Sequence, residues 1–591
     1  MSHTMLQRRG LQRRGLHRRT RSLAALTSAM GLLLGATALT SSPAGSAEPA
    51  GDCTDTFPLA NVAKGQTVEG LTVSSGVTPE PFSGEVLGVL ESGIAPGLDM
   101  IIMDLDSPAI QAAGGIWQGM SGSPVYDATD GRLIGAVAYG LAWGSSPVAG
   151  ITPFEDMDDY LAAAAGRPGK VEVGKTLAQR IANHTDVTAA QAAQGMRQLP
   201  MPLGVSGLSS QRLGSLEGRR PYVSKQTYVV GTAGVAGAPT ADDIVAGGNI
   251  AASLAFGDIT LAGVGTATQV CDGRVVGFGH PMAFTGESTM SMHPADAIYV
   301  QEDPLGAPFK VANLGAPVGT ITDDRLTGIT GSYGPLPDAM TVTSTVTSGD
   351  RSREGTSYVT SQRAAAEVIF YQLVGNHDRV IDGVIPGTET QSWTISGTDA
   401  NGAPFSAEFS DRYTSMWDIT YEASFDLPDL VYGMSQLPGV TIEEVTSDAA
   451  VTTSTARYAV GAIQQYRQGA WVTLGKKEPA RVKAGRKLIL RSLLKGPSGT
   501  EALTTSFTVP KRAHDQKGSL SFIGGNELYS EAAYQNSLGK ILAGIKANVR
   551  NDEVQVDLGI FGRKVEIAKR QVLGPVDLVV TGARRVRVIV D

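Results

Sequence analysis

Short β-type runs separated by turn residues recur along most of the chain, and this pattern restricts the fold more than any single motif does. Runs such as "QTVEGLTVSS", "TVTSTVTSG" and "KLILRSLLKG" are rich in β-branched and apolar residues and are bounded by turn residues. Glycine is frequent, with 72 of the 591 residues, where ~7% is usual. We therefore expect a globular, mainly β protein, and the length implies several domains.

The first 47 residues differ from everything that follows. The basic stretch "LQRRGLQRRGLHRRTRS" precedes the apolar run "LAALTSAMGLLLGATALT", and "SSPAGSA" then adds small residues. This order is typical of a bacterial secretory signal peptide, so we expect cleavage after Ala47 and an exported chain, secreted or associated with the cell envelope. An uncleaved membrane anchor is the alternative. The arginine pairs leave a twin-arginine route open beside the general secretory one.

Removal of residues 1–47 makes the chain more acidic. It takes away seven arginines and no acid, so the formal net charge moves from −8 to −15. An acidic surface repels the phosphate backbone of nucleic acids. We therefore expect no nucleic-acid partner.

Two cysteines, Cys53 and Cys271, remain in the mature chain. In an exported protein an isolated pair predicts one disulfide bond, which would tie the mature N-terminus to a distant hairpin. Two buried free thiols are the alternative.

Changes in composition divide the mature chain into five stretches. We expect an amphipathic helix within 529–549, a further helix at 361–377 and an Asp-Gly hairpin within 260–280. The predicted divisions are a β half with the candidate Asp and Ser at 48–165, a helical or linker segment at 166–238, a β half with the candidate His at 239–395, a β-sandwich-like accessory domain at 396–515, and a C-terminal α+β segment at 516–591.

The stretch "GGIWQGMSGSPVYD" at 114–127 places serines in a glycine-rich turn before a strand pattern. A serine hydroxyl needs a base, a partner that orients the base, and donors for the oxyanion. The flanking glycines let the backbone turn so that N–H groups can converge. Ser121 is then the candidate nucleophile, and the amides of Gly119 and Ser121 are the candidate oxyanion hole. Ser-Gly-Ser turns are also common in loops that have no chemical role.

The segment "GGIWQGMSGSPVYDATDGRLIGAVAYG" closely resembles the serine motif of the SpoIVB-type serine peptidases. The resemblance implies a chymotrypsin-like double β-barrel with a Ser-His-Asp triad. Its pattern has an Asp 15 residues before the serine, which corresponds to Asp106; Asp104 lies two residues earlier on the same strand face. In such a barrel the strand edge at Tyr139, Gly140 and Leu141 would pair with the substrate backbone.

Five histidines follow the leader, and His280 in "RVVGFGHPMAFTG" is the candidate base. This segment resembles the histidine motif of the same family, with a Gly-His at a strand end. We interpret His184, His377 and His514 as solvated or capping residues, and His293 in "SMHPADA" as a weaker second candidate. A histidine with a pKa near neutrality can accept the serine proton and later return it.

The resemblance implies an exported serine endopeptidase, with Ser121 as nucleophile, His280 as base and acid, and Asp106 as the orienting carboxylate. Its substrate would be a protein, a peptide or the chain itself. No metal-ligand or nucleotide-binding motif occurs, so we expect no cofactor and no metal. The order of Ser before His is the reverse of the family's sporulation member, and no PDZ module precedes the serine. A non-catalytic binding or scaffold protein of the cell envelope, built on a peptidase-like core, is therefore the alternative.

Overall fold

The computed structural model describes residues 53–142, 144–158, 171–199, 203–224, 227–229, 238–303, 308–562 and 565–591. The predicted signal peptide at 1–47 lies outside these residues. The described residues all fall within one compact unit, Ser46–Asp591. In this part of the chain, no helix is both long enough and apolar enough to cross a membrane.

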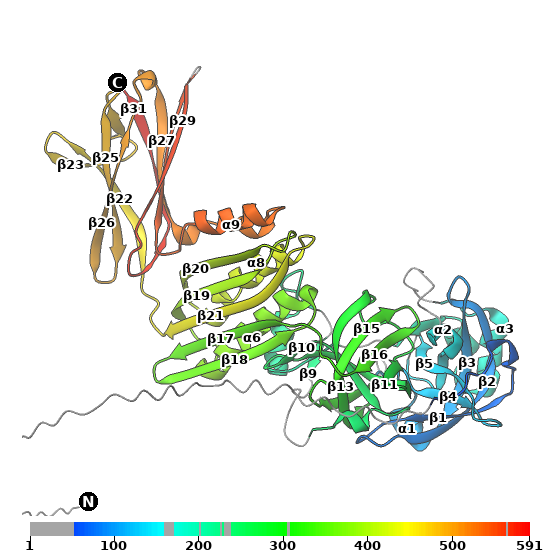
Figure 1. Ribbon diagram of the computed structural model, residues 1–591. Helices are drawn as coiled ribbons and strands as arrows, with labels where there is room; N and C mark the ends of the chain where they lie inside the picture. The colour runs from blue at the N-terminus through cyan, green and yellow to red at the C-terminus, as the bar shows by residue number, and fades with distance from the viewer. Residues whose placement is uncertain are drawn as a thin grey trace, which may run out of the picture. The chain divides into compact units, whose positions relative to one another are not determined.

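Six strands of the N-terminal region close into a first barrel (Figure 1). They pair in the order β1-β2-β3-β6-β5-β4, and β4 returns to β1. Residues of alternating orientation on β3 face two different apolar clusters, as strand geometry requires. The elements are β1 (Thr67–Thr72), β2 (Glu80–Ala95), β3 (Leu98–Asp106), α1 (Pro108–Ala113), β4 (Pro124–Asp127), β5 (Leu133–Leu141), β6 (Val148–Pro153) and α2 (Phe154–Asp158).

Six later strands close into a second barrel, in the order β10-β13-β15-β16-β12-β11 with β11 returning to β10. Its β11–β12 hairpin turns through Asp272 and Gly273, whose φ angles of 46° and 73° suit the predicted Asp-Gly turn. The two barrels confirm the expected double-barrel core. The strands are β10 (Asn249–Gly257), β11 (Leu261–Cys271), β12 (Arg274–Gly277), β13 (Gly286–Gln301), β14 (Phe309–Leu314), β15 (Gly319–Arg325) and β16 (Gly328–Tyr333), with β14 pairing β13.

The segment between the barrels, expected to be helical or linker-like, also contributes strands to both of them. Here β7 (Met196–Gln198) pairs with β5 of the first barrel, and β8 (Leu203–Val205) pairs with β11 of the second. The other elements are α3 (Lys175–His184), α4 (Ala189–Ala192), α5 (Ser210–Leu216) and β9 (Thr227–Val229). The segment is therefore part of the core, because its strand edges satisfy backbone groups of both barrels.

A layer of sheet and helices follows the second barrel, to which it is joined by pairing of β18 with β10. The predicted helix at 361–377 is present as α6, which is almost wholly buried against β17, β18 and α8. The elements are β17 (Met340–Ser348), β18 (Arg351–Val359), α6 (Ala365–Ile381), β19 (Gly387–Thr398), β20 (Pro404–Ser415), α7 (Ile419–Ala423), α8 (Asp426–Ser435) and β21 (Thr441–Thr452).

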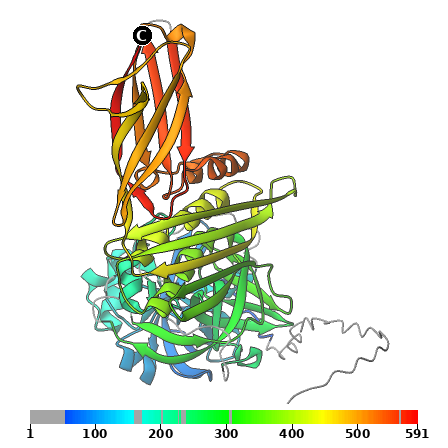
Figure 2. The same cartoon turned by 90° about the vertical axis from the view of Figure 1, so that its left-hand side faces the viewer.

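The C-terminal region is a sandwich of two five-stranded sheets with an apolar core between them, and its long strands are visible in Figure 2. One sheet pairs β23-β22-β25-β26 with β30 on β22, and the other pairs β24-β31-β27-β28-β29. The elements are β22 (Arg457–Arg467), β23 (Ala470–Thr473), β24 (Ala480–Val482), β25 (Lys487–Gly496), β26 (Gly499–Thr508), β27 (Lys517–Gly524), α9 (Leu538–Ala547), β28 (Val554–Gly562), β29 (Val565–Leu573), β30 (Val579–Thr581) and β31 (Ala583–Val590).

The structure divides this part of the chain differently from the sequence prediction. The predicted boundary at 395 falls inside β19, and β20 and β21 belong to the preceding sheet. The sandwich instead takes strands from both sides of the predicted boundary at 515. The amphipathic helix, expected within 529–549, is the shorter α9 and packs with α8 and not into the sandwich. Strand spacing could not reveal this, because partners in a sheet are chosen by non-local packing.

The cysteine pair forms the predicted disulfide bond, Cys53–Cys271. It joins the segment before the first barrel to the end of β11 in the second barrel. Beside it, the Gln269 amide donates to the carbonyl of Thr54 at 2.9 Å. The N-terminal segment is thus fastened to the second barrel.

Candidate active site

Ser121 lies in the turn between α1 and β4, and local hydrogen bonds shape that turn. The Met120 amide donates to the Trp117 carbonyl, and the Ser123 amide donates to the Met120 carbonyl, each at 3.0 Å. Gly119 and Gly122 have φ angles of 94° and 96°, which residues other than glycine rarely adopt. A Cβ on Gly122 would collide with the Thr266 carbonyl of the second barrel. Glycine is required there for the close approach of the two barrels.

The second barrel holds the serine turn by donating hydrogen bonds to the carbonyl groups of that turn. Thr266 donates from its amide to the Ser121 carbonyl at 2.8 Å and from its hydroxyl to the Gly119 carbonyl at 3.1 Å. The Thr268 hydroxyl donates to the Gly122 carbonyl at 2.8 Å. Among the described residues, the amides of Gly119 and Ser121 donate to no acceptor. These are the two amides that the sequence predicted for an oxyanion hole.

His280 follows β12 and reaches Ser121 across the boundary between the barrels. Its Nε2 lies 2.8 Å from Ser121 Oγ, and both side chains are 0% exposed. The two preceding residues, Phe278 and Gly279, have φ angles of 68° and 67°, a conformation uncommon for a residue such as phenylalanine. The first barrel holds this turn, because the Thr152 hydroxyl donates to the Gly279 carbonyl at 2.6 Å. The fold thus brings together two residues 159 positions apart.

The other ring nitrogen of His280 faces a carbonyl and an amide. Nδ1 lies 2.9 Å from the Pro281 carbonyl oxygen and 2.9 Å from Gln198 Nε2. Burial lowers the pKa of His280 to about 4, and the bond to the Pro281 carbonyl opposes this in part. The buried imidazole is therefore neutral near pH 7.

The structure does not bring Asp106 to His280, and this corrects the predicted triad. Asp106 ends β3 as an exposed residue, and its Oδ1 accepts a hydrogen bond from Gln111 at 2.7 Å. No hydrogen bond joins Asp104 or Asp106 to His280 in the described part of the chain. Burial, followed by the charge of Asp106, raises the pKa of Asp104. Motif spacing missed this outcome because it fixes positions along the chain and not the direction of a strand end.

His293, the second candidate, is bonded to another serine. Its Nε2 lies 2.8 Å from Ser253 Oγ and its Nδ1 lies 2.9 Å from the Gly315 carbonyl oxygen. Both side chains are fully buried within the second barrel. The structure therefore does not place His293 beside Ser121.

The remaining histidines have structural partners. The prediction from the sequence that His377 is a solvated or capping residue is wrong. His377 is fully buried in α6, where its Nε2 lies 2.8 Å from Glu389. Although burial opposes it, the Glu389 carboxylate raises the pKa of His377. His184 bonds to the Arg180 carbonyl near the end of α3, and His514 lies exposed beside Asp515. None of these residues contacts Ser121.

Three residues that support the pair were not identified from the sequence. Gln198 contacts His280 as described. Asp324, which is fully buried, accepts backbone hydrogen bonds from Met282 at 2.7 Å and Ala283 at 2.8 Å, and so holds the loop after His280. The buried Lys310 lies against Gly119 and donates to Asn249 at 2.7 Å. A sequence signal existed only for Asp324, in the "DDR" run that ends β15 of the second barrel.

The predicted substrate edge is already paired with another strand. Tyr139, Gly140 and Leu141 at the end of β5 lie opposite Gln198, Arg197 and Met196 of β7, in antiparallel register. The edge that would bind an extended peptide is thus occupied by residues of the same chain.

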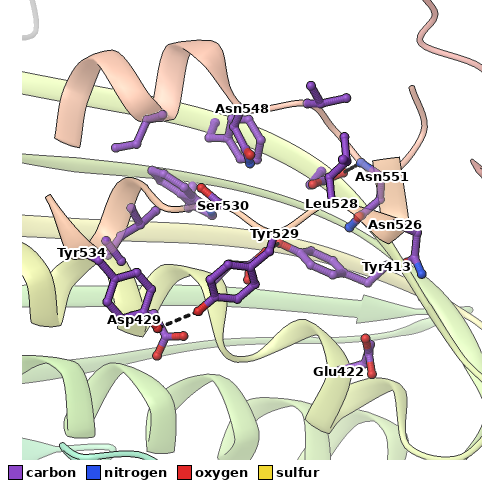
Figure 3. A pocket seen from close by; sticks show the side chains of 18 residues that line it. Tyr413, Glu422, Asp429, Asn526, Leu528, Tyr529, Ser530, Tyr534, Asn548 and Asn551 are labelled. Carbon is purple, nitrogen blue, oxygen red and sulfur yellow. Dashed lines mark hydrogen bonds between the residues drawn. The ribbon is translucent and has the colours of Figure 1, made fainter. Parts of the chain in front are cut away.

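A pocket of about 190 Å³ lies apart from the serine turn, in the layer around α8 and α9 (Figure 3). Carboxylates and tyrosines, among them Asp429 and Tyr529, line it together with asparagines from the 526–551 segment. Burial raises the pKa of Asp411, another lining residue, to about 7. The Tyr529 and Tyr534 hydroxyls lie 2.6 Å apart at its rim. None of its lining residues belongs to either barrel.

Comparison with known proteins found a family match in the region that carries the serine turn. Residues 55–152 match the model of the SpoIVB peptidase S55 family. This span contains strands β1 to β5 of the first barrel, β6 except for its last residue, and both Asp106 and Ser121. His280 and the second barrel lie outside the matched span. No curated protein and no solved structure matched the chain. The match supports the family resemblance seen in the sequence: residues 55–152 of this chain are similar to the SpoIVB peptidase S55 family.

Proposed function

We propose that the chain is an exported serine endopeptidase in which Ser121 is the nucleophile and His280 is the general base and acid. The distance of 2.8 Å between His280 Nε2 and Ser121 Oγ, in a chain with a serine-peptidase family region, carries the proposal. The amides of Gly119 and Ser121, which donate to no acceptor among the described residues, support it, since acyl transfer needs donors for the oxyanion.

The arrangement supports the following reaction. Nδ1 carries its hydrogen and donates it to the Pro281 carbonyl, which leaves Nε2 free to accept the proton of Ser121. Ser121 Oγ attacks the substrate carbonyl, and the amides of Gly119 and Ser121 stabilise the oxyanion. His280 returns the proton to the leaving amine, and water then cleaves the acyl-enzyme by the same steps. Here a neutral carbonyl orients the imidazole, where a carboxylate does so in a Ser-His-Asp triad.

A non-catalytic binding protein of the cell envelope is the second candidate. The absence of a carboxylate bonded to His280 in the described residues favours it, because a carboxylate stabilises the imidazolium that forms during acyl transfer. Complete burial of Ser121 also favours it.

The proposal includes export through the leader at residues 1–47, with cleavage after Ala47. The basic, apolar and small-residue order supports this, and the Cys53–Cys271 disulfide fits an oxidising compartment. We propose a protein or peptide substrate, which includes the chain itself, and no nucleic-acid partner. N-terminal sequencing of the protein isolated from a secreting host tests the cleavage site; an intact Met1 would contradict it.

Labelling with a fluorophosphonate tests the reaction. The full mature chain is incubated with the probe, and mass spectrometry locates the label. We expect modification of Ser121 and its loss in the Ser121→Ala variant, whereas Ser253→Ala, the matched control at the other buried Ser–His pair, retains it. A folded sample in which Ser121 stays unmodified would favour the binding protein.

A further inference from the structure

A short segment of the chain pairs with the strand edge that the sequence predicted for substrate binding. Resting on the proposed function, we infer that residues 195–199, here called the edge segment, occupy the acyl-side subsites of Ser121, close the site, and show that it prefers an aliphatic residue before the cleaved bond. Three sets of observations carry this inference: the register of the segment, the placement of its side chains, and the burial of the serine and histidine.

The backbone of the edge segment pairs with β5 as an added strand would. The Leu199 amide donates to the Ala138 carbonyl at 3.0 Å, and the Ala142 amide donates to the Gly195 carbonyl at 2.9 Å. Between these bonds, Gly140 lies opposite Arg197 in antiparallel register. Addition of a strand to a free sheet edge is a general mode of peptide binding. The edge segment therefore uses the backbone groups of β5 that an extended substrate would need.

The same part of β5 is bonded to the serine turn, so the segment ends beside Ser121. The Gly122 amide donates to the Val137 carbonyl at 2.7 Å, and the Val137 amide donates to the Ser123 carbonyl at 3.0 Å. The next residue, Ala138, accepts the bond from Leu199. Leu199 thus occupies the position that a bound substrate would fill with the residue directly before its cleaved bond.

The side chains of the edge segment are sorted as a bound peptide would require. Leu199 is 2% exposed and belongs to the apolar cluster that contains Ile116, Trp117 and Met120, the residues just before Ser121. The Gln198 side-chain amide donates to the Pro281 carbonyl at 3.0 Å, and Arg197 is only half-buried. An apolar pocket formed by the serine turn itself accepts an aliphatic side chain and rejects a charged one.

The segment closes the site but leaves its reactive donors unused. Ser121 and His280 are 0% exposed, and Gln198 covers Nδ1 of the histidine. Within the described part of the chain the amides of Gly119 and Ser121 nevertheless have no acceptor, so the Leu199 carbonyl does not occupy them. The segment consequently blocks entry without being held for attack. If the segment left the site, His280 would become exposed. This exposure would relieve the burial that lowers the pKa of His280.

The test loosens the edge segment without touching Ser121 or His280. Arg197→Pro removes the amide hydrogen opposite Gly140 that an antiparallel ladder uses, whereas the matched control Arg197→Ala keeps it. Full mature chains are compared for the rate of fluorophosphonate labelling at Ser121, with thermal unfolding as the check on folding. We expect labelling about tenfold faster in the proline variant, since a lost backbone bond shifts the segment toward release, and no change in the alanine variant.

The preferred substrate is tested on the Arg197→Pro chain with the fluorogenic peptides Met-Arg-Gln-Leu-aminomethylcoumarin and Met-Arg-Gln-Asp-aminomethylcoumarin. We expect kcat/KM to be about tenfold or more higher for the leucine peptide.

The outcomes separate this inference from the proposed function. Equal and measurable labelling of wild type and Arg197→Pro, or equal cleavage of the two peptides, would overturn the inference and leave the peptidase proposal standing. Folded Arg197→Pro protein that neither reacts with the probe nor cleaves either peptide would overturn both.

Discussion

The described residues contain two buried Ser–His pairs that are nearly identical in local geometry. In both, Nε2 lies 2.8 Å from a serine Oγ and Nδ1 lies 2.9 Å from a backbone carbonyl oxygen. Burial lowers the pKa of both histidines to about 4. Only the pair of Ser121 and His280 lies across the two barrels; that of Ser253 and His293 lies within the second barrel.

The difference between the pairs lies in the backbone that carries the serine. Ser121 is in a glycine-rich turn whose amides at 119 and 121 have no acceptor among the residues that the structure describes. Ser253 is in the middle of β10, which pairs with β11 on one side and β13 on the other. In a strand that is paired on both sides, the amides donate to the neighbouring strands, so none is free to donate to an oxyanion. A short Ser–His distance is therefore insufficient, and the turn makes one pair a candidate site.

The largest expected difference is between the two histidines. On the Arg197→Pro chain, His280→Gln should lower kcat/KM for the leucine peptide by about 10³-fold or more, because the serine loses its base. His293→Gln should leave kcat/KM unchanged and cost about 1–3 kcal/mol of stability, since it disturbs a buried hydrogen bond. Steady-state kinetics and thermal unfolding of both variants measure this. Similar losses of activity in the two variants would erase the distinction between the pairs.

The next effect concerns the oxyanion donors. In Gly119→Ala, a Cβ would lie 2.9 Å from Lys310 Cβ at a φ of 94°, so the turn must shift and the Gly119 amide with it. We expect a loss of about 10²-fold in kcat, as for removal of one oxyanion donor. The control is Gly131→Ala, which has a φ of 74° but open space around its Cβ. It should lower stability only; full activity in Gly119→Ala would remove the proposed donor.

In their response to pH the two pairs should behave alike. Each histidine has a folded pKa of about 4 and an unfolded pKa near 6.5, so the unfolded chain binds more protons in between. Stability therefore falls as the pH is lowered from 6.5 to 4, by up to about 3 kcal/mol for each histidine. Either His→Gln variant should show a smaller fall, measured as unfolding by denaturant across this range. An unchanged pH slope in one variant would show that its histidine is not buried neutral.

The smallest expected effect on activity comes from the disulfide. Replacement of Cys53 and Cys271 by serine should lower the melting temperature, as loss of a native disulfide costs about 2–5 kcal/mol. It should change kcat/KM by no more than about twofold, because the Thr266 and Thr152 bonds still join the barrels at the site. A large loss of activity without global unfolding would show that the disulfide itself aligns Ser121 with His280.

Local motifs pointed to part of the site and missed the rest. Ser121, Gly119 and His280 stand out because glycines beside a nucleophile or a base are a local signal of a special backbone conformation. Asp106 matched the motif spacing, yet it lies exposed and bonded to Gln111. Gln198 and Lys310 carry no local signal, since their roles depend on residues more than 60 positions away.

The sequence by itself determined the mainly β class, the Asp-Gly hairpin, the cysteine pair and the serine turn, because periodicity and turn chemistry act between near neighbours in the chain. Only the tertiary structure decided that His280 meets Ser121, that Pro281 and Gln198 take the place expected for Asp106, and that residues 195–199 pair with the substrate edge. These outcomes depend on which strand edges meet when two barrels close and pack. The same order of strands along a chain is compatible with several such pairings, and only burial of the whole core selects one of them.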